Sequence, residues 1–319
     1  MHSLGRLNLK VGMNITLFGG AGFLGAQIAR SLLRQGNEVR IFDKPGAKMN
    51  PHAFGLNQAV WLEGDFANSL DVKKAVAGSD IILHLISTTL PKQSSEDLSY
   101  DLVSNAVPTL HLLECARDAG VKKLLYFSSG GTVYGQAQYL PMDENHPTNP
   151  LVPYGITKLA IEKYCLLYEK LYGLRTHILR VSNPYGPTQL ANQAQGAVGV
   201  FLSRILNNQP IEIWGDGSVV RDYLYIEDLT RAVKHMIDYQ GSESVFNIGS
   251  GVGLSLNEII LFVESALDKK ADCRYHASRS FDVPTNILSI ERAQQELGWV
   301  PEQSFASGLQ KTIVSILGH

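Results

Sequence analysis

Short apolar runs alternate with amphipathic segments along the first 187 residues. The helical segments extend from AQIARSLLRQ at 26–35, which Gly36 ends, to a long amphipathic stretch at 153–173. Strands that alternate with helices form parallel sheets covered on both faces. The pattern therefore predicts an α/β fold built on a doubly wound parallel sheet. The predicted strands are NITLF (14–18), EVRIFD (38–43), VWLEGD (60–65), DIILHLI (80–86), KLLYFSS (123–129) and RTHILRVS (175–182).

The pattern changes after Pro187. Short strands at 211–214 and 244–248 alternate there with two amphipathic helices, at 226–239 and 255–267. The chain has no linker, repeat or low-complexity segment that would separate two independent units. We therefore predict a larger domain at 1–187 and a smaller C-terminal α/β region at 188–319, which faces a substrate and interleaves with the first.

The chain has 319 residues, of which 45% are hydrophobic and 18% charged, and a net charge of -2. This balance is ordinary for a soluble enzyme and, without any basic run, argues against a nucleic-acid partner. No apolar run reaches membrane-spanning length, and the N-terminal MHSLGRLNLKVG lacks the apolar core of a signal peptide. Cys115, Cys165 and Cys273 match no disulfide or metal-binding spacing. We expect a cytoplasmic protein with reduced cysteines, no metal site and no membrane partner.

A glycine-rich turn, GGAGFLG, joins the first predicted strand to the first helix. Glycines permit the close approach of a pyrophosphate, which the helix N-terminus attracts. Asp43 ends the next strand, where a carboxylate can bind both hydroxyls of an adenosine ribose. A tight turn without a ligand is the alternative, but the combination favours NAD, and Lys44 leaves NADP open. The predicted cofactor contacts here are Gly19, Gly22, Phe23, Leu24, Gly25 and Asp43.

Tyr154 and Lys158 are spaced to lie one turn apart on one face of the helix at 153–173. A free tyrosine has a pKa of about 10, too high for a base at neutral pH. A neighbouring ammonium and a positively charged nicotinamide ring would favour the phenolate, as abstraction of a sugar hydroxyl proton requires. The alternative is a packed tyrosine beside a solvated lysine. It is less favoured in a chain that also has a dinucleotide-binding turn. We predict that both residues are catalytic and contact the cofactor.

With these motifs together, the chain resembles the extended short-chain dehydrogenase/reductase family, and within it the NAD-dependent sugar epimerase/dehydratase group typified by UDP-galactose 4-epimerase. The resemblance implies a Rossmann-type NAD-binding domain at 1–187, a nucleotide-sugar-binding region at 188–319 and a nucleotide-diphosphate sugar as substrate. The motifs that carry it are GGAGFLG, Gly64-Asp65, SSGGTVYG (128–135), PYGITK (153–158), RVSNPYGP (180–187), WGDGSVVRDYLYIEDL (214–229) and FNIGSGVGLS (246–255).

The resemblance also implies roles for single residues. Further cofactor contacts would come from Asp65 and Phe66, from the strand end at His84, Leu85 and Ile86, and from Asn105, which would steady the surroundings of the lysine. Asn183 would contact the sugar, Arg221 and Arg279 would hold the diphosphate, Asp282 would bind the nucleotide ribose and Trp214 would line the base pocket. An Arg221–Asp222 ion pair and a core position for Trp214 are the alternatives.

The segment SSGGTVYG lacks one expected hydroxyl, because the catalytic Ser or Thr of similar enzymes aligns with Gly130. Similar dehydratases carry Asp and Glu at the next two positions, where this chain has Gly131 and Thr132. Elimination of water would therefore lack its proton carriers, and C4 epimerisation of a UDP-hexose through a transient 4-keto sugar is the predicted reaction. Ser129 is the predicted replacement hydroxyl; Thr132, a water, or direct contact of the sugar with Tyr154 remain open.

Two other functions remain open. A nucleotide-sugar reductase of the same fold would release a reduced product and consume NAD(P)H. A non-catalytic NAD-binding regulator would have kept the fold and lost the chemistry, although the intact Tyr154 and Lys158 argue against it.

The helix at 153–173 has two apolar stripes, whereas a helix that only covers a sheet needs one. We therefore predict a homodimer in which this helix and the one at 102–119 form a four-helix bundle with their copies, as in similar epimerases. The stripes are Ile156, Leu159, Ala160, Leu167 and Leu171, and Ile161, Cys165, Tyr168 and Tyr172.

Overall fold

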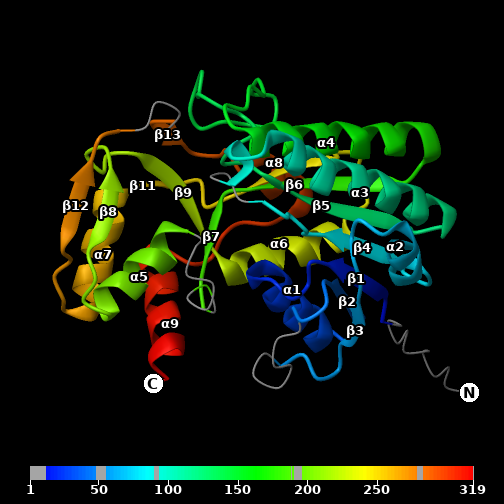
Figure 1. The fold of residues 1–319 in the computed structure, drawn as a ribbon, viewed down its shortest axis with the longest axis horizontal. Helices are drawn as coiled ribbons and strands as arrows, with labels where there is room; N and C mark the ends of the chain where they lie inside the picture. Colours follow the sequence, from blue (N-terminus) through cyan, green and yellow to red (C-terminus); the bar gives the residue numbers. More distant parts are fainter. Residues whose placement is uncertain are drawn as a thin grey trace, which may run out of the picture.

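The computed structural model describes residues 12–47, 55–89, 93–187, 189, 196–278 and 283–318 (Figure 1). Its centre is a parallel seven-stranded sheet of order β10-β6-β5-β4-β1-β2-β3. The strand order reverses between β1 and β4, and folds of this kind bind ligands at the carboxyl ends of the strands at such a point. The strands are β1 (Asn14–Phe18), β2 (Glu38–Asp43), β3 (Val60–Glu63), β4 (Ile81–His84), β5 (Lys123–Ser129), β6 (Arg175–Val181) and β10 (Val245–Ile248).

Helices cover both faces of this sheet, which is why an inner strand such as β4 is buried along its whole length. One face packs against α2 (Ser69–Val76), α3 (Leu98–Asp118) and α4 (Pro153–Tyr172), and the other against α1 (Phe23–Arg34) and α6 (Ile226–Asp238). Leu124 and Tyr126 of β5 belong to the first core, whereas Leu125 and Phe127 belong to the second. The doubly wound Rossmann-type architecture predicted from the sequence is confirmed.

A smaller part lies to the left of the large sheet in Figure 1. It contains a four-stranded sheet, in which β9 pairs with β7, β11 and β13, and a two-stranded sheet of β8 and β12. Its strands are β7 (Asn183–Tyr185), β8 (Ile211–Trp214), β9 (Val220–Tyr225), β11 (Gly253–Ser255), β12 (Cys273–His276) and β13 (Thr285–Asn286). Its helices are α5 (Ala197–Leu206), α7 (Leu256–Leu267) and α9 (Phe305–Leu317), while α8 (Glu291–Leu297) packs near β10.

The two parts exchange segments along the chain. Both α6 and β10 follow Pro187, yet they belong to the layers of the large sheet. The strand predicted at 244–248 therefore extends the large sheet rather than the C-terminal region, because its apolar run pairs with β6. Among the described residues, no helix is long and apolar enough to cross a membrane.

Candidate active site

The glycine-rich turn lies between the end of β1 and the start of α1. Gly25 packs so closely on the turn that a Cβ there would lie 2.4 Å from the Gly19 carbonyl oxygen. At Gly22 a Cβ would meet only that same oxygen, at 3.5 Å. No side chain caps the N-terminus of α1, so its first N–H groups can bind an anion. The turn is closely packed at Gly25, where the helix meets the strand, and open at Gly22. This shape fits the pyrophosphate of a dinucleotide, which would approach at Gly22.

Asp43 ends β2 beside this turn. Its Oδ2 accepts a hydrogen bond from the Ala21 N–H at 3.0 Å, and its Oδ1 accepts one from the Lys44 N–H at 2.9 Å. The carboxylate is thus fixed next to the glycine-rich turn and remains partly exposed. This is a suitable position for binding the hydroxyls of an adenosine ribose.

The chain segments that follow β3 and β4 lie at the same edge of the sheet. The Leu85 N–H donates to the last residue of β1 at 2.8 Å, and the backbone nitrogen of Ile86 would lie 3.0 Å from a Cβ on Gly19. The ring of Phe66 packs on the last residue of β1 with 6.0 Å between centroids, and Asp65 beside it is exposed. The structure therefore places Leu85, Ile86 and Phe66, three of the predicted cofactor contacts, beside the carboxyl end of β1.

Tyr154 and Lys158 lie one turn apart at the start of α4. The Nζ of Lys158 donates to the Phe127 carbonyl oxygen at 2.9 Å and lies 5.6 Å from the centroid of the Tyr154 ring. Burial lowers the pKa of Lys158 to about 8. Burial also raises the pKa of Tyr154 to about 12, and a hydrogen bond with Ser87 opposes that shift. In the protein alone, Tyr154 is a neutral phenol, and a positive charge placed beside it would favour the phenolate.

Asn105 of α3 holds the loop that follows β4. Among the described residues it forms no hydrogen bond with Lys158. Its Oδ1 accepts a hydrogen bond from the Thr88 N–H at 2.9 Å, and its Nδ2 donates to the Asp101 carbonyl oxygen at 2.9 Å. Asp101, which the sequence analysis did not single out, is also buried there. Its only sequence signal is a charged residue in line with the apolar residues of a helix, which is weak before the packing of α3 is known.

The two serines at the end of β5 point to opposite faces of the sheet, as neighbouring strand residues do. Ser128 donates a hydrogen bond to Glu162 of α4. Ser129 points away from α4: a Cβ on Gly131 would lie 3.8 Å from the Ser129 Oγ and 4.0 Å from the Asn183 Oδ1. The predicted catalytic Ser129 and the predicted sugar contact Asn183 therefore converge on the glycine gap.

Gly130 and Thr132 complete this turn. A Cβ on Gly130 would lie 2.6 Å from Cδ1 of Leu288, so a serine there would collide with a buried side chain. The Oγ1 of Thr132 is buried and has no hydrogen-bond partner among the described residues. The carbonyl oxygen of Thr132 would lie 2.8 Å from a Cβ on Gly155, the residue after Tyr154. The backbone of Thr132 therefore packs against the first turn of α4.

Two of the predicted substrate contacts lie beside this gap, on β7 and β9. The Nδ2 of Asn183 donates to the Asp222 carbonyl oxygen at 2.9 Å. The Nη1 of Arg221 donates to the Val220 and Val283 carbonyl oxygens at 2.8 and 2.6 Å. The Asp222 carboxylate accepts its hydrogen bonds from the backbone and side chain of Ser250 instead, at 2.7 and 2.8 Å. The alternative of an Arg221–Asp222 ion pair is therefore wrong.

Trp214 ends β8 and is 40% exposed, so the alternative of a core position is wrong. Its ring stacks on His276 with 5.4 Å between centroids. Arg279 and Asp282, the other predicted substrate contacts, lie outside the described residues.

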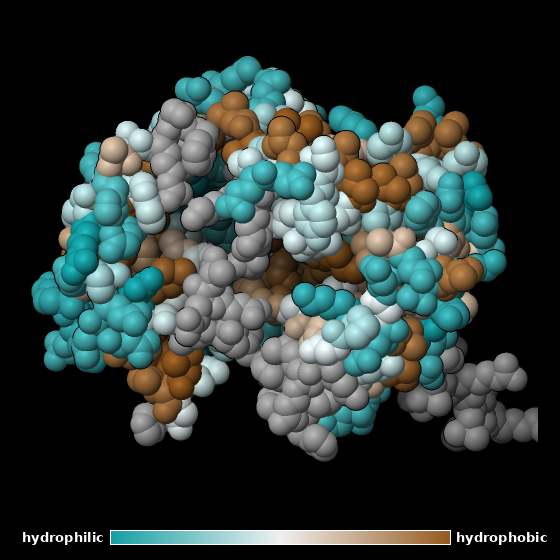
Figure 2. Space-filling view, viewed as in Figure 1, coloured by the Kyte–Doolittle hydropathy of each residue, from teal (hydrophilic) through white to brown (hydrophobic). Residues whose placement is uncertain are grey.

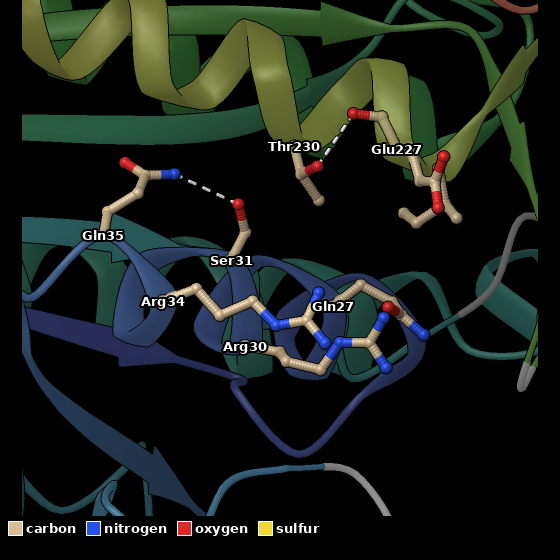
Figure 3. Close-up of a pocket in the computed structure, with 8 residues that line it drawn as sticks. Gln27, Arg30, Ser31, Arg34, Gln35, Glu227 and Thr230 are labelled. Atoms are coloured by element: carbon tan, nitrogen blue, oxygen red, sulfur yellow. Dashed lines mark hydrogen bonds between the residues drawn. The ribbon is translucent and has the colours of Figure 1, made fainter.

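A separate pocket of about 250 Å³ lies between α1 and α6 (Figure 3). Figure 3 shows Arg30 and Arg34 side by side on α1, with Glu227 on α6 across from them. None of the predicted site residues lines this pocket. This pocket is therefore distinct from the predicted cofactor site at the carboxyl ends of β1 and β4.

Comparison with known proteins identifies the family. Residues 15–249 match the model of the NAD dependent epimerase/dehydratase family. The chain belongs to this family. It is an NAD-dependent enzyme of the epimerase group, with NAD as its cofactor.

Several relatives extend over almost the whole chain. A putative UDP-glucose 4-epimerase of Methanocaldococcus jannaschii is 33% identical over 302 residues, which cover 94% of this chain and 97% of that protein. A dTDP-4-dehydro-6-deoxyglucose reductase of Escherichia coli is 33% identical over 313 residues, covering 96% and 98%.

Solved structures agree with the fold. The UDP-glucose 4-epimerase of Thermotoga maritima with UDP-glucose superposes with a TM-score of 0.90 at 30% identity, covering 96% of this chain and 99% of that one. The Thermus thermophilus UDP-glucose 4-epimerase with NAD superposes with a TM-score of 0.87 at 29% identity, with the same coverage.

Proposed function

We propose that this protein is a nucleotide-sugar 4-epimerase that inverts C4 of a UDP-hexose through a transient 4-keto sugar. One observation carries this proposal. Tyr154 and Lys158 form a single acid/base pair, and the turn at 130–132 before their helix contains no carboxylate. Gly131 and Thr132 stand where a dehydratase needs its acid and base, so removal of water has no proton carriers there. The M. jannaschii and T. maritima relatives named as UDP-glucose 4-epimerases support the same choice.

The residues of the Rossmann-type part would hold NAD. The turn from Gly19 to Gly25 would bind its pyrophosphate, Asp43 its ribose and the segment at 85–86 its inner half. Bound NAD supplies a hydride acceptor and donor at the sugar carbon. The orientation of that carbon is set by the surrounding side chains of this chain.

Proton transfer is the task of Tyr154. As phenolate it would take the proton of the 4-hydroxyl, and as phenol it would return a proton to the 4-keto oxygen. Lys158 would stabilise the phenolate by its charge, because its Nζ lies over the tyrosine ring. The open side of Gly131, where a Cβ would have no contact nearer than 3.8 Å, would leave room for the ketosugar to turn over between the two transfers.

The placement of the two candidate hydroxyls divides their roles. The backbone of Thr132 packs against the first turn of α4, and its Oγ1 lacks a partner among the described residues, which together favour it as the proton relay to Tyr154. Ser129 lies beside Asn183 on the other face of the strand end, which favours a hydrogen bond to the sugar. Both residues would then touch the substrate.

The C-terminal region at 188–319 would bind the nucleotide. Arg221, together with Arg279, would hold the diphosphate, since a guanidinium pairs with phosphate oxygens at two points. Trp214 presents an exposed ring for the base, and Asp282 would accept from the ribose.

We also propose a homodimer formed through α3 and α4. Figure 2 shows apolar side chains gathered over these two helices. On α4, Ile161 and Cys165 of one predicted stripe are buried against the sheet, whereas Leu167 and Leu171 of the other are 43% and 58% exposed. An exposed apolar stripe next to a second one on α3 is what a four-helix bundle would cover. The three cysteines form no disulfide, which suits the proposed cytoplasmic location.

The proposal is tested by incubating the purified protein, without added cofactor, with a panel of UDP- and GDP-hexoses and resolving the products by NMR. We expect one UDP-hexose to interconvert with its 4-epimer. Consumption of NADPH in step with product would identify a reductase instead, and NAD binding without any product would identify a regulator.

A further inference from the structure

Asp101 is a fully buried carboxylate behind the catalytic pair, with an exposed fraction of 1%. Its Oδ2 accepts a hydrogen bond from Thr157 Oγ1 at 2.5 Å, and its Oδ1 accepts one from the Thr89 hydroxyl. Thr157 lies on α4 between Tyr154 and Lys158. The carboxylate of α3 is therefore bonded directly to the turn of α4 that carries the acid/base pair.

These hydrogen bonds do not neutralise the charge of Asp101. Its partners are two hydroxyls and, at 3.5 Å, the amide of Asn105, and no cation lies within ion-pair distance among the described residues. A buried charge is costly unless an opposite charge lies nearby. The candidate for this opposite charge is Lys158. Lys158 is also buried, and its own hydrogen bond goes to an uncharged backbone carbonyl.

The other ionisable groups around the pair are ion-paired, uncharged or exposed. Glu162 forms a buried ion pair with Arg180 at 2.7 Å, although its charge, after that of Asp101, also opposes the fall in the pKa of Lys158 that burial causes. Burial lowers the pKa of His84 to about 3 and raises the pKa of Tyr126 and of Cys165, so all three are uncharged at neutral pH. Glu96 and Asp97, at the start of α3, are exposed to screening water. Among the described groups near Tyr154, Asp101 is therefore a buried carboxylate without an ion-pair partner, and Lys158 is a buried amine without one.

We propose that Asp101 is a positioning residue that keeps Tyr154 a neutral phenol and Lys158 an ammonium unless a further positive charge lies beside them. The inference rests on the proposed function, in which Tyr154 alternates between base and acid. Oxidised NAD carries a positive nicotinamide ring and its reduced form does not. Asp101 would thus make the phenolate depend on the oxidised cofactor, so that Tyr154 is a base before oxidation of the sugar and an acid after it.

The sign of the effect follows from the charges. The carboxylate of Asp101 raises the pKa of Tyr154, after the larger effect of burial, and opposes the fall in the pKa of Lys158 that burial causes. Removing the charge should lower both pKa values. A phenolate would then form at lower pH, and the acid limb of the pH–rate profile would move to lower pH.

The test compares the NAD-bound parent with the isosteric variant Asp101→Asn. Phenolate absorbance is titrated in each protein and in its Tyr154→Phe counterpart, and the difference isolates Tyr154 from the other tyrosines. We expect the Tyr154 transition of Asp101→Asn to lie about one pH unit or more lower, the usual effect of one nearby charge. The acid limb of turnover should shift with it.

Thr157→Val is the matched control, because it removes the hydrogen bond between α3 and α4 and keeps the charge. Its Tyr154 transition should stay near that of the parent. If Asp101→Asn does not fold, Asp101→Ser removes the same charge and should give the same direction. An unshifted transition in the folded, NAD-loaded variant would overturn the inference and leave Asp101 a structural anchor. The titration needs no sugar, so a parent that fails to epimerise any sugar would overturn only the proposed function.

Discussion

At the scale of single residues, the proposed chemistry depends on a phenol that the protein alone keeps neutral. Burial raises the pKa of Tyr154 to about 12, and Lys158 lies over its ring. The spacing of these two residues was predicted from helical periodicity, because residues four apart share a face. Tyr154→Phe should reduce turnover at least 10²–10⁴-fold, roughly the contribution of a positioned proton-transfer group, without loss of bound NAD. Steady-state kinetics and the cofactor content of the purified variant measure both, and activity within a few-fold of the parent would contradict the mechanism.

The two hydroxyls of the glycine gap give a second prediction at this scale. Thr132→Val should lower kcat by about 10²–10⁴-fold, because the relay acts in the transition state. Ser129→Ala should mainly raise KM, because its hydroxyl lies beside Asn183 rather than next to α4. Measuring kcat and KM of both variants shows which of the two hydroxyls is the proton relay. A large loss of kcat in Ser129→Ala, with mainly a raised KM in Thr132→Val, would identify Ser129 as the relay.

At the scale of elements, the end of β5 explains why this chain has glycine where similar enzymes have a hydroxyl. A Cβ on Gly130 would lie 2.6 Å from the buried Leu288. Gly130→Ser should therefore destabilise the protein by about 1–3 kcal/mol, the usual effect of overpacking a core. Gly131→Ala is the control, since its Cβ would have only ordinary contacts, the nearest at 3.8 Å. Thermal unfolding of both measures this, and a Gly130→Ser protein as stable as the parent would refute the packing argument.

Elements were predictable from the sequence where their signal is local. The apolar run of β5 at 123–129 and the helix that begins at Pro153 were predicted with nearly the observed bounds, because period and turn residues specify them. The pairing of β10 with β6 and the contact between Gly130 and Leu288 join residues far apart in the chain, so no local pattern reports them. Asp101 was missed for the same reason, since its burial arises only when α3 packs against α4.

At the scale of the whole molecule, the exposed apolar stripes of α3 and α4 predict a dimer. Leu102 and Val103 of α3 are 48% and 59% exposed, and Leu167 of α4 is 43% exposed. Sedimentation at micromolar concentration should give the mass of two chains. Leu167→Glu should shift the protein towards monomer, whereas Leu261→Glu on α7, also exposed, should not. A monomeric parent would refute the proposed bundle.

The central claim is that the hydrogen at C4 of a UDP-hexose leaves and returns within one active site. The most direct measurement follows a UDP-hexose labelled with deuterium at C4, incubated in ordinary water with the purified protein and no added NAD. The account predicts that the 4-epimer forms and keeps its deuterium at C4, as NMR and mass spectrometry would show. Loss of the deuterium to water, or product formed only in step with added reduced cofactor, would contradict it.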